Sequence, residues 1–173
     1  ANIYLHGFDQ QIRAAGVGEL VRYADDFVIL CRTRKQAETA LTLAGDILGG
    51  LGLQLHPGKT KIVDLREGRE GFDFLGCHFR ARMAGRLWEQ KRIVRYYLHR
   101  WPSQKAMQTV REKIRQQTER TRLRVDLGEL VGTLNRIIVG WRAYFAIGNS
   151  IKKLADLDRS VWLRLSGFLT KRH

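Results

Sequence analysis

The hydrophobic pattern of this 173-residue chain changes its period once, close to Trp101 and Pro102. Before this point, apolar residues occur in short alternating runs that glycine and aspartate separate, which is typical of strands joined by tight turns. After it, apolar residues recur at helical spacing, which indicates amphipathic helices. We therefore expect an α+β protein, in which residues 1–101 form a mixed region and residues 102–173 form a helical one.

The mixed region is predicted to open with a helix and a hairpin of two strands. Apolar positions predict a helix over residues 1–15, and strands are expected over residues 19–23 and 27–32. Residues 24–26 form the predicted turn, because aspartate tolerates turn geometry and hydrogen-bonds to its own backbone.

A second helix is predicted to begin after Thr33, because Gln36 three positions later completes the signature of a capping box. The glycines at positions 49, 50 and 52 are expected to end this helix. The strands expected further along cover residues 53–55, 61–65, 72–79 with an interruption at Gly76, and 87–89 after a turn at 83–86.

The helical region is predicted to hold three helices. Ser103, Asp126 and Ser150 each precede a segment with helical apolar spacing, and serine and aspartate are favoured helix N-caps. Trp141 and Trp162 fall on the apolar faces of the second and third helices, so both are expected in the core.

Charge is segregated along the chain. The 31 Lys and Arg against 17 Asp and Glu give a formal net charge of +14. Residues 1–79 hold 9 basic and 10 acidic side chains, whereas residues 80–173 hold 22 and 7. All the basic excess lies in the second part, which predicts that this part faces a polyanion. The alternative is a generally basic surface that only favours solubility.

Composition argues against a membrane, secreted or zinc-binding protein. The longest apolar run, Phe27–Cys31, is too short to cross a bilayer, and residues 1–10 lack the features of a signal peptide. The thiols of Cys31 and Cys77 are expected to be buried in a reducing compartment, so we expect a cytoplasmic protein of bacterial type without a membrane partner. The five histidines show no zinc-ligand spacing.

Residues 23–26, Tyr-Ala-Asp-Asp, are the sharpest candidate for catalysis. Two adjacent carboxylates at a turn between strands offer the hard oxygen ligands that Mg²⁺ prefers. Two such ions activate an attacking oxygen and stabilise a leaving one in nucleotidyl transfer. The alternative is ordinary turn chemistry, for which adjacent aspartates are well suited.

The segment RYADDFVIL at residues 22–30 resembles the central catalytic hairpin of reverse transcriptases, in the form typical of group II intron-encoded proteins. Four further segments resemble successive parts of that family: residues 1–6, 51–60 (LGLQLHPGKT), 71–76 (GFDFLG, the primer-grip motif) and 134–145 (LNRIIVGWRAYF, the maturase-specific thumb or domain X). Residues 162–173 fit the last helix of that thumb. The likeness is collinear and covers nearly the whole chain. It implies the C-terminal part of a polymerase palm over residues 1–101, followed by a three-helix thumb over residues 102–173.

The resemblance also implies roles for individual residues. Asp25 and Asp26 are expected to be two of three carboxylates that bind Mg²⁺, and Lys59 is expected to neutralise or protonate the leaving pyrophosphate. The residues expected at the nucleotide or the primer strand are Tyr23, Ala24, Leu75 and Gly76. Without the resemblance, Tyr23 is interpreted as a plain strand aromatic and Lys59 as a solvated turn lysine.

The basic helices are the candidate RNA-binding surface. Arg111 and Arg115 are four residues apart and so share one helix face. Arginine contacts to phosphate give an affinity that falls with salt, and a folded RNA is recognised largely by its shape. The alternative is a set of solvated helix faces. The side chains expected to bind RNA are Arg111, Lys113, Arg115, Arg120, Arg122, Arg124, Arg136 and Arg142.

The resemblance implies two alternative functions. In the first, the chain is part of an RNA-directed DNA polymerase that acts on an RNA/DNA primer-template with nucleoside triphosphates and two Mg²⁺ ions. That protein also binds group II intron RNA to assist splicing and mobility (retrohoming). In the second, the chain is a non-catalytic maturase fragment that binds intron RNA as a splicing cofactor. A homodimer is compatible with either function.

Two departures from the family pattern bear on activity. The family's first catalytic aspartate and its fingers lie upstream of the first predicted helix, so that segment is expected upstream or in trans. Asp9 does not replace this aspartate, because it falls within the helix. Arg136 stands where the thumb motif usually has proline, which removes a helix-start constraint and adds a positive charge.

We therefore expect that this chain alone, with two of the three carboxylates, does not polymerise. The measurement is primer extension with Mg²⁺ and all four nucleotides, and the expected yield is no product above a control without protein. Robust synthesis by the isolated chain would contradict this expectation.

Overall fold

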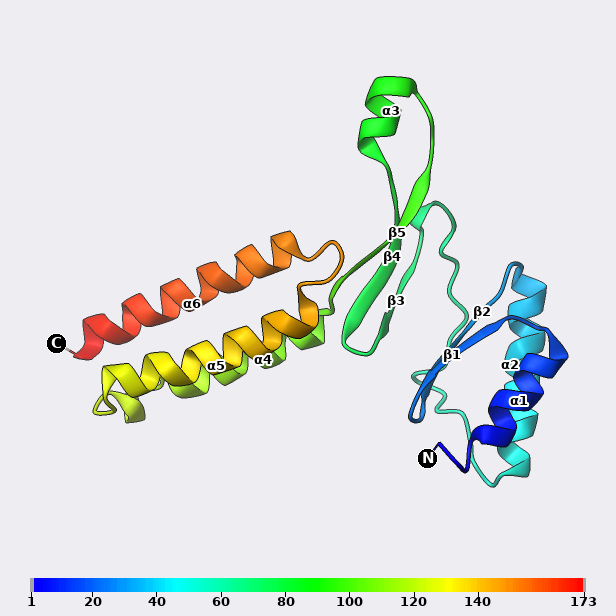
Figure 1. Cartoon of the computed structure of the whole chain (residues 1–173), viewed down its shortest axis with the longest axis horizontal. Coiled ribbons are helices and arrows are strands. Elements are labelled where there is room, and N and C mark those ends of the chain that lie inside the picture. Colours follow the sequence, from blue (N-terminus) through cyan, green and yellow to red (C-terminus); the bar gives the residue numbers. More distant parts are fainter. Residues whose placement is uncertain (1, 173) are drawn as a thin grey trace. The chain divides into compact units, whose positions relative to one another are not determined.

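The computed structural model describes residues 2–172, except for the side chains of residues 86 and 87, and it confirms the α+β class (Figure 1). The chain divides into two compact units, Ala1–Glu70 and Gly71–His173. This packing division differs from the predicted sequence domains, residues 1–101 and 102–173, whose boundary stays a prediction.

The first unit packs two helices against a two-stranded antiparallel hairpin. The order along the chain is α1 (His6–Ala15), β1 (Glu19–Tyr23), β2 (Asp26–Leu30) and α2 (Arg34–Gly50). Helix α1 begins later than predicted, because the chain before it forms a turn in which the amide of His6 donates to the carbonyl oxygen of Ile3 at 3.3 Å.

The core of this unit lies between the two helices and the hairpin. Phe8 and Ile12 of α1 are fully buried, and they belong to one apolar cluster with Ala44 and Leu48 of α2. Residues of both strands pack against this cluster, among them Phe27, whose ring centroid lies 5.0 Å from that of Phe8. The hairpin is therefore supported by the helices from one side.

The capping box at the start of α2 is confirmed. The Thr33 hydroxyl accepts from the amide of Gln36 at 3.2 Å, and the Gln36 side chain accepts from the amide of Thr33 at 3.3 Å. The helix includes Gly49 and ends at Gly50. Leu51 is its C-cap, and Gly52 follows with a φ of +70°.

The strands predicted at residues 53–55 and 61–65 are wrong, because this segment is irregular up to a short 3₁₀ turn, η1 (Arg66–Gly68). Side chains provide the backbone partners here that a neighbouring strand would otherwise provide. The amide of Asp64 donates to the Glu70 carboxylate at 2.6 Å, and the amide of Arg66 donates to the Asp64 carboxylate at 2.9 Å.

The second unit begins with a three-stranded antiparallel sheet in the order β3 (Gly71–Phe74), β4 (Cys77–Met83) and β5 (Tyr96–Pro102). The single strand predicted over residues 72–79 is therefore a hairpin, because Leu75 and Gly76 both have positive φ and reverse the chain. The predicted turn and strand over residues 83–89 are also wrong. Helix α3 (Gly85–Lys91) occupies that segment, and β5 was not predicted.

Three long helices complete the second unit, as predicted: α4 (Gln104–Gln117), α5 (Leu127–Phe145) and α6 (Ile151–Arg172), with a 3₁₀ turn η2 (Arg120–Arg122) after α4. The predicted caps Ser103 and Asp126 accept from the amides of Ala106 and Glu129. No helix within residues 2–172 is long and apolar enough to cross a bilayer.

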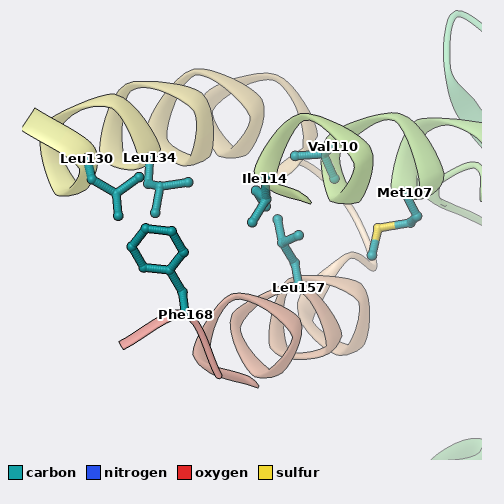
Figure 2. Packing of buried hydrophobic residues seen from close by; sticks show 7 residues of the cluster. All are labelled: Met107, Val110, Ile114, Leu130, Leu134, Leu157 and Phe168. Carbon is teal, nitrogen blue, oxygen red and sulfur yellow. The ribbon is translucent and has the colours of Figure 1, made fainter. Parts of the chain in front are cut away.

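The helices share one buried apolar core, which Figure 2 shows from close by. Its buried members are Met107, Val110 and Ile114 of α4, Leu130 and Leu134 of α5, and Leu157 and Phe168 of α6. Trp141 packs against this core, which confirms its predicted burial. Trp162 is 66% exposed, so its predicted burial is wrong.

Leu157→Ala should destabilise the helical core by about 2–5 kcal/mol, because the site is fully enclosed and the lost side chain leaves a cavity. Urea unfolding followed by tryptophan fluorescence measures this, because Trp141 packs against the same core. The control is Leu163→Ala on the same helix, where the side chain is 55% exposed and the expected change is within about 0.5 kcal/mol. Equal effects of the two substitutions would contradict the assignment of this core.

Candidate functional site

The turn between β1 and β2 presents the predicted pair of carboxylates. Tyr23 pairs with Asp26, so the turn consists of Ala24 and Asp25 alone, and the predicted three-residue turn is one residue too long. Ala24 takes a positive φ of 55°, which is uncommon for a residue with a side chain and marks a tight reversal. Asp25 is therefore at the tip, and Asp26 is the first residue of β2.

The site is open at the surface. Asp25 and Asp26 are both exposed, and neither side chain makes a hydrogen bond or an ion pair with any residue in the described part of the chain. Tyr23 is 67% exposed, so it is not a core aromatic. No described side chain thus neutralises the two carboxylates.

Arg22 is the cation nearest in sequence to this pair, and Asp9 of α1 binds it instead. The Arg22 Nε and Nη2 atoms donate to the two Asp9 oxygens at 2.7 and 2.6 Å, and both side chains are largely buried. A third nitrogen, Nη1, donates to the carbonyl oxygen of Ala24 at 2.6 Å. Arg22 therefore ties the turn to α1. Its hydrogen bonds hold the pKa of the Asp9 carboxyl below its ordinary value of 3.8.

The donor set at the turn fits part of a magnesium site. Asp25 and Asp26 offer hard oxygen ligands at adjacent positions of the chain, and Mg²⁺ is commonly bound by one or two carboxylates together with water and substrate phosphates. No group of three or more metal-ligating side chains is present within residues 2–172. The described residues therefore include two of the three carboxylates that the family resemblance implies.

Lys59 makes no hydrogen bond or ion pair with Asp25 or Asp26 and belongs to a separate turn. It ends a turn in which the amides of Lys59 and Thr60 donate to the carbonyl oxygen of His56 at 3.1 and 2.9 Å. Its side chain is exposed and makes no hydrogen bond or ion pair with a described residue. Its proposed contact with a triphosphate stays a prediction.

The turn at Leu75 and Gly76, the predicted primer contact, is held by the helical part of its own unit. The Tyr144 hydroxyl donates to the carbonyl oxygen of Leu75 at 3.0 Å. The amide of Ser103 donates to the carbonyl oxygen of Gly76 at 2.8 Å. Gly76 has a φ of +74°, and a Cβ there would lie 3.3 Å from Phe145 Cζ. Glycine suits this position, because it takes the positive φ without strain and because a side chain here would crowd Phe145.

The role of Tyr144 was missed by the sequence analysis. The only sequence signal for this role is the adjacent pair of aromatic residues, Tyr144 and Phe145, at the end of the predicted helix. Such a pair is equally compatible with packing in the core. Phe145 is buried, with its ring centroid 4.6 Å from that of Trp141 and 4.7 Å from that of Tyr144. Tyr144 itself is largely exposed and reaches the Leu75 carbonyl from the last turn of α5.

The candidate RNA-binding side chains of α4 lie on two flanks of the helix. Arg111 and Arg115 share one flank, as predicted, whereas Lys113 is rotated by about 200° from Arg111. Arg111 and Lys113 are exposed and have no ion-pair partner in the described region. Arg115 donates to Glu112 at 2.9 Å and holds the pKa of that carboxyl below its ordinary value. Arg111 is thus the less compensated charge on its flank.

The remaining candidates differ in their surroundings. Arg120 lines a pocket of about 230 Å³ with Thr118, Arg164 and Lys171. The Nε atom of Arg122 is buried and has no hydrogen-bond partner within residues 2–172. Arg124 and Arg142 are exposed, and Arg136 is exposed with one bond to the Thr133 hydroxyl at 3.0 Å.

Two cations of α6 are structural, which the sequence analysis did not distinguish from the rest. Arg164 donates to the Thr118 hydroxyl at 3.3 Å and to the carbonyl oxygen of Arg115 at 3.4 Å, where α4 ends. Arg172 donates to the carbonyl oxygen of Val125 at 2.6 Å. Arg164 thus adds a donor to a carbonyl at the end of α4, which also accepts from the amide of Thr118 at 3.0 Å, and Arg172 binds a carbonyl of the loop before α5.

Comparison with protein families assigns both ends of the chain. A family model described as "Reverse transcriptase (RNA-dependent DNA polymerase)" matches residues 1–79, and one described as "Group II intron, maturase-specific domain" matches residues 107–173. The chain belongs to the group II intron reverse transcriptase/maturases. No curated protein matches the chain at a significant level.

The family membership confirms the resemblance and the order of its parts. The Tyr-Ala-Asp-Asp turn lies in the reverse transcriptase match, and so does the turn at Leu75 and Gly76. Helices α5 and α6 and most of α4 lie in the maturase-specific match. The roles of the individual site residues and the bound Mg²⁺ stay predictions.

Asp9→Asn should destabilise the first unit at neutral pH, because the variant loses the carboxylate that binds Arg22. The pKa of Asp9 is lowered by folding, so its ionised form stabilises the folded state above its ordinary pKa of 3.8, and this contribution disappears as the pH falls through the lowered value. We expect the gap between the two proteins to be full at pH 7 and to shrink below about pH 4.

Amide hydrogen exchange in β1 and β2 measures this effect, because all four tryptophans lie between residues 88 and 162 and report on the second unit. The matched control is Glu38→Gln, which removes the exposed ion pair with Arg34 and should change protection little. Equal protection in Asp9→Asn and the unaltered chain at pH 7 would contradict a stabilising role for the pair.

Proposed function

We propose that this chain supplies the metal-binding hairpin and the thumb of an RNA-directed DNA polymerase that also binds group II intron RNA. The observation that carries the proposal is the exposed pair of carboxylates, Asp25 and Asp26, in a segment that matches reverse transcriptases. Structural aspartates at a turn are usually hydrogen-bonded to nearby groups, whereas these two have no partner among the described residues.

The hairpin fits a place in a two-metal polymerase site. Asp25 and Asp26 would hold Mg²⁺, which activates the attacking 3′-oxygen and stabilises the leaving pyrophosphate in such enzymes. The chain's own contribution is to hold the backbone of the turn that carries both carboxylates. Arg22 serves this by binding Asp9 and the Ala24 carbonyl, which leaves the negative charge of the turn uncompensated.

Tyr23 and Lys59 have supporting roles in this proposal. Tyr23 is exposed on the same strand pair as Asp26, so its ring is available to a nucleotide or a primer end. Lys59 carries a free ammonium group at a turn, where it would neutralise or protonate a leaving pyrophosphate. The turn at Leu75 and Gly76 would bring backbone close to the primer strand.

The thumb helices are proposed to bind intron RNA. Arg111, Lys113 and Arg142 are exposed and have no partner within the described residues, so they are free to contact phosphates. Each phosphate contact releases condensed counterions, which gives affinity and makes it fall with salt. The match to the maturase-specific domain covers all three of these side chains.

A second candidate function is a splicing cofactor without polymerase activity. The observation that favours it is the segregation of charge, since all the basic excess lies in residues 80–173, outside the hairpin that carries the carboxylates. RNA binding by the thumb requires none of the metal-binding residues. The two functions therefore predict different effects of substitutions in the two units.

The test is made in a polymerase-competent protein that contains this chain together with the rest of the palm. Asp25→Asn with Asp26→Asn should abolish DNA synthesis and leave intron RNA affinity nearly unchanged. Arg111→Ala with Arg115→Ala should weaken RNA binding and reduce the slope of log K against log salt by about one unit per lost phosphate contact.

The matched control for the arginine variants is Arg34→Ala, which removes an exposed, ion-paired arginine of α2 outside the proposed surface. Primer extension and filter binding over a salt series give the two measurements. If the aspartate variants damaged RNA binding most, or the arginine variants damaged only synthesis, the proposed division of roles would be wrong. Normal synthesis by the aspartate variants would favour the splicing-cofactor function alone.

A further inference from the structure

The sheet of the second unit has one polar, aromatic face, most of which lies outside both family matches. Residues 80–106 lie between the two matched segments, and they include most of β4 and all of β5. Between residues 80 and 102 the chain holds seven Lys and Arg and one Glu, together with four aromatic residues. This composition is typical of a surface that binds nucleic acid.

The register of the strands assigns each side chain to a face. His78 pairs with Trp101, and Arg82 pairs with Tyr97, so these four side chains share one face of the sheet. The residues on this face are Asp73, His78, Arg80, Arg82, Tyr97, His99 and Trp101, which we call the aromatic–arginine face. The opposite face is mostly apolar, with the rings of Phe72 and Phe79 stacked at 5.3 Å, and it also carries Tyr96 and Arg100.

Planar groups are arranged along the aromatic–arginine face. The Arg82 guanidinium carbon lies 4.6 Å from the centroid of the Trp101 ring, and the His78 ring centroid lies 5.1 Å from that of Trp101. Near the other end of β5, the guanidinium of Arg95 lies 6.0 Å from the centroid of the Tyr97 ring. Stacked guanidinium and aromatic planes are the groups on which nucleic-acid bases stack.

The face is accessible and positively charged. Arg82 is exposed, and the Tyr97 side chain is 46% exposed. The face carries one carboxylate, that of Asp73. The Nδ1 atom of His78 lies 2.6 Å from the Asp73 Oδ1 atom. Arginine and tyrosine in this arrangement suit a single strand of nucleic acid, because its bases are unstacked and its phosphates are negative. An apolar protein partner would instead suit the opposite, mostly apolar face.

We propose that the aromatic–arginine face binds a single-stranded segment of nucleic acid, with bases stacked on Tyr97 and on the Arg82–Trp101 pair. The turn at Leu75 and Gly76 joins β3 to β4 at one end of this face, beside Asp73 and His78. A strand that reaches this turn therefore continues along the sheet. The inference rests on the proposed function, because it extends the nucleic-acid contacts of the same polymerase from the turn to the sheet.

The test uses the whole chain and two fluorescein-labelled oligonucleotides, U8 RNA and dT8 DNA, with fluorescence anisotropy as the readout. Arg82→Gln with Tyr97→Ala should weaken binding of both about tenfold, because base stacking and one phosphate contact are lost. The matched control is Arg32→Gln with Leu98→Ala. It removes the same charge from the first unit and a 55% exposed side chain from the opposite face of β5, and it should bind as the unaltered chain does.

Cross-linking of the unaltered chain tests the same proposal without a substitution that affects folding. U8 that contains 4-thiouridine should cross-link to peptides that contain Tyr97 or Trp101. Cross-links confined to residues 104–172, or unchanged affinity in Arg82→Gln with Tyr97→Ala, would overturn the proposal. Equal competition by an oligoglutamate of eight residues would also overturn it, because charge alone would then explain the binding.

The thumb variant Arg111→Ala with Arg115→Ala separates this proposal from the proposed function. If it weakens oligonucleotide binding and the sheet variant does not, the sheet proposal is wrong and the RNA-binding helices stand. If the sheet variant alone weakens binding, the sheet proposal stands, and those two arginines take no part in binding a short single strand. If the unaltered chain binds neither oligonucleotide, the sheet proposal is overturned.

Discussion

The ion pair between Arg22 and Asp9 determines the electrostatics of the candidate catalytic hairpin. Two nitrogens of the guanidinium bind both carboxylate oxygens of Asp9, and the third nitrogen binds the Ala24 carbonyl. The same contacts fix α1 against β1 and prevent the nearest arginine from neutralising Asp25 and Asp26. An acidic residue outside the turn thus keeps the turn acidic. Asp9 is unsuited to bind a metal itself, because its two oxygens are already occupied by Arg22.

Local signals predicted the parts of the fold that depend on local interactions. The caps at Thr33, Ser103 and Asp126 are correct, because a cap is a hydrogen bond between residues three positions apart. The strand predictions at residues 61–65 and 87–89 failed, because a strand needs a partner that its own sequence does not specify. Strand β5 was missed for the converse reason, since its basic and aromatic residues form a strand only when they pair with β4.

The candidate site shows the same limit. Asp25 and Asp26 are candidates because of four consecutive residues and the family resemblance around them, and the structure leaves both side chains exposed, while their role stays a prediction. Three other features depend on how the elements of each unit pack together. They are the binding of Arg22 by Asp9, the contact of Arg164 with the end of α4, and the exposure of Trp162. Arg164 and Arg111 are indistinguishable in a charge count. Only the packing separates a cation that satisfies a helix end from one that is free to contact a phosphate.

The attachment of the 75–76 turn to α5 has a mechanical consequence. Tyr144 and Phe145 belong to the last turn of a 19-residue helix, and both contact the turn. A helix of this length extends about 28 Å and behaves as a stiff rod. A displacement of the distant end of α5 therefore moves the Leu75 carbonyl oxygen through its hydrogen bond with the Tyr144 hydroxyl. A ligand that tilts the rod shifts the loop that joins β3 to β4.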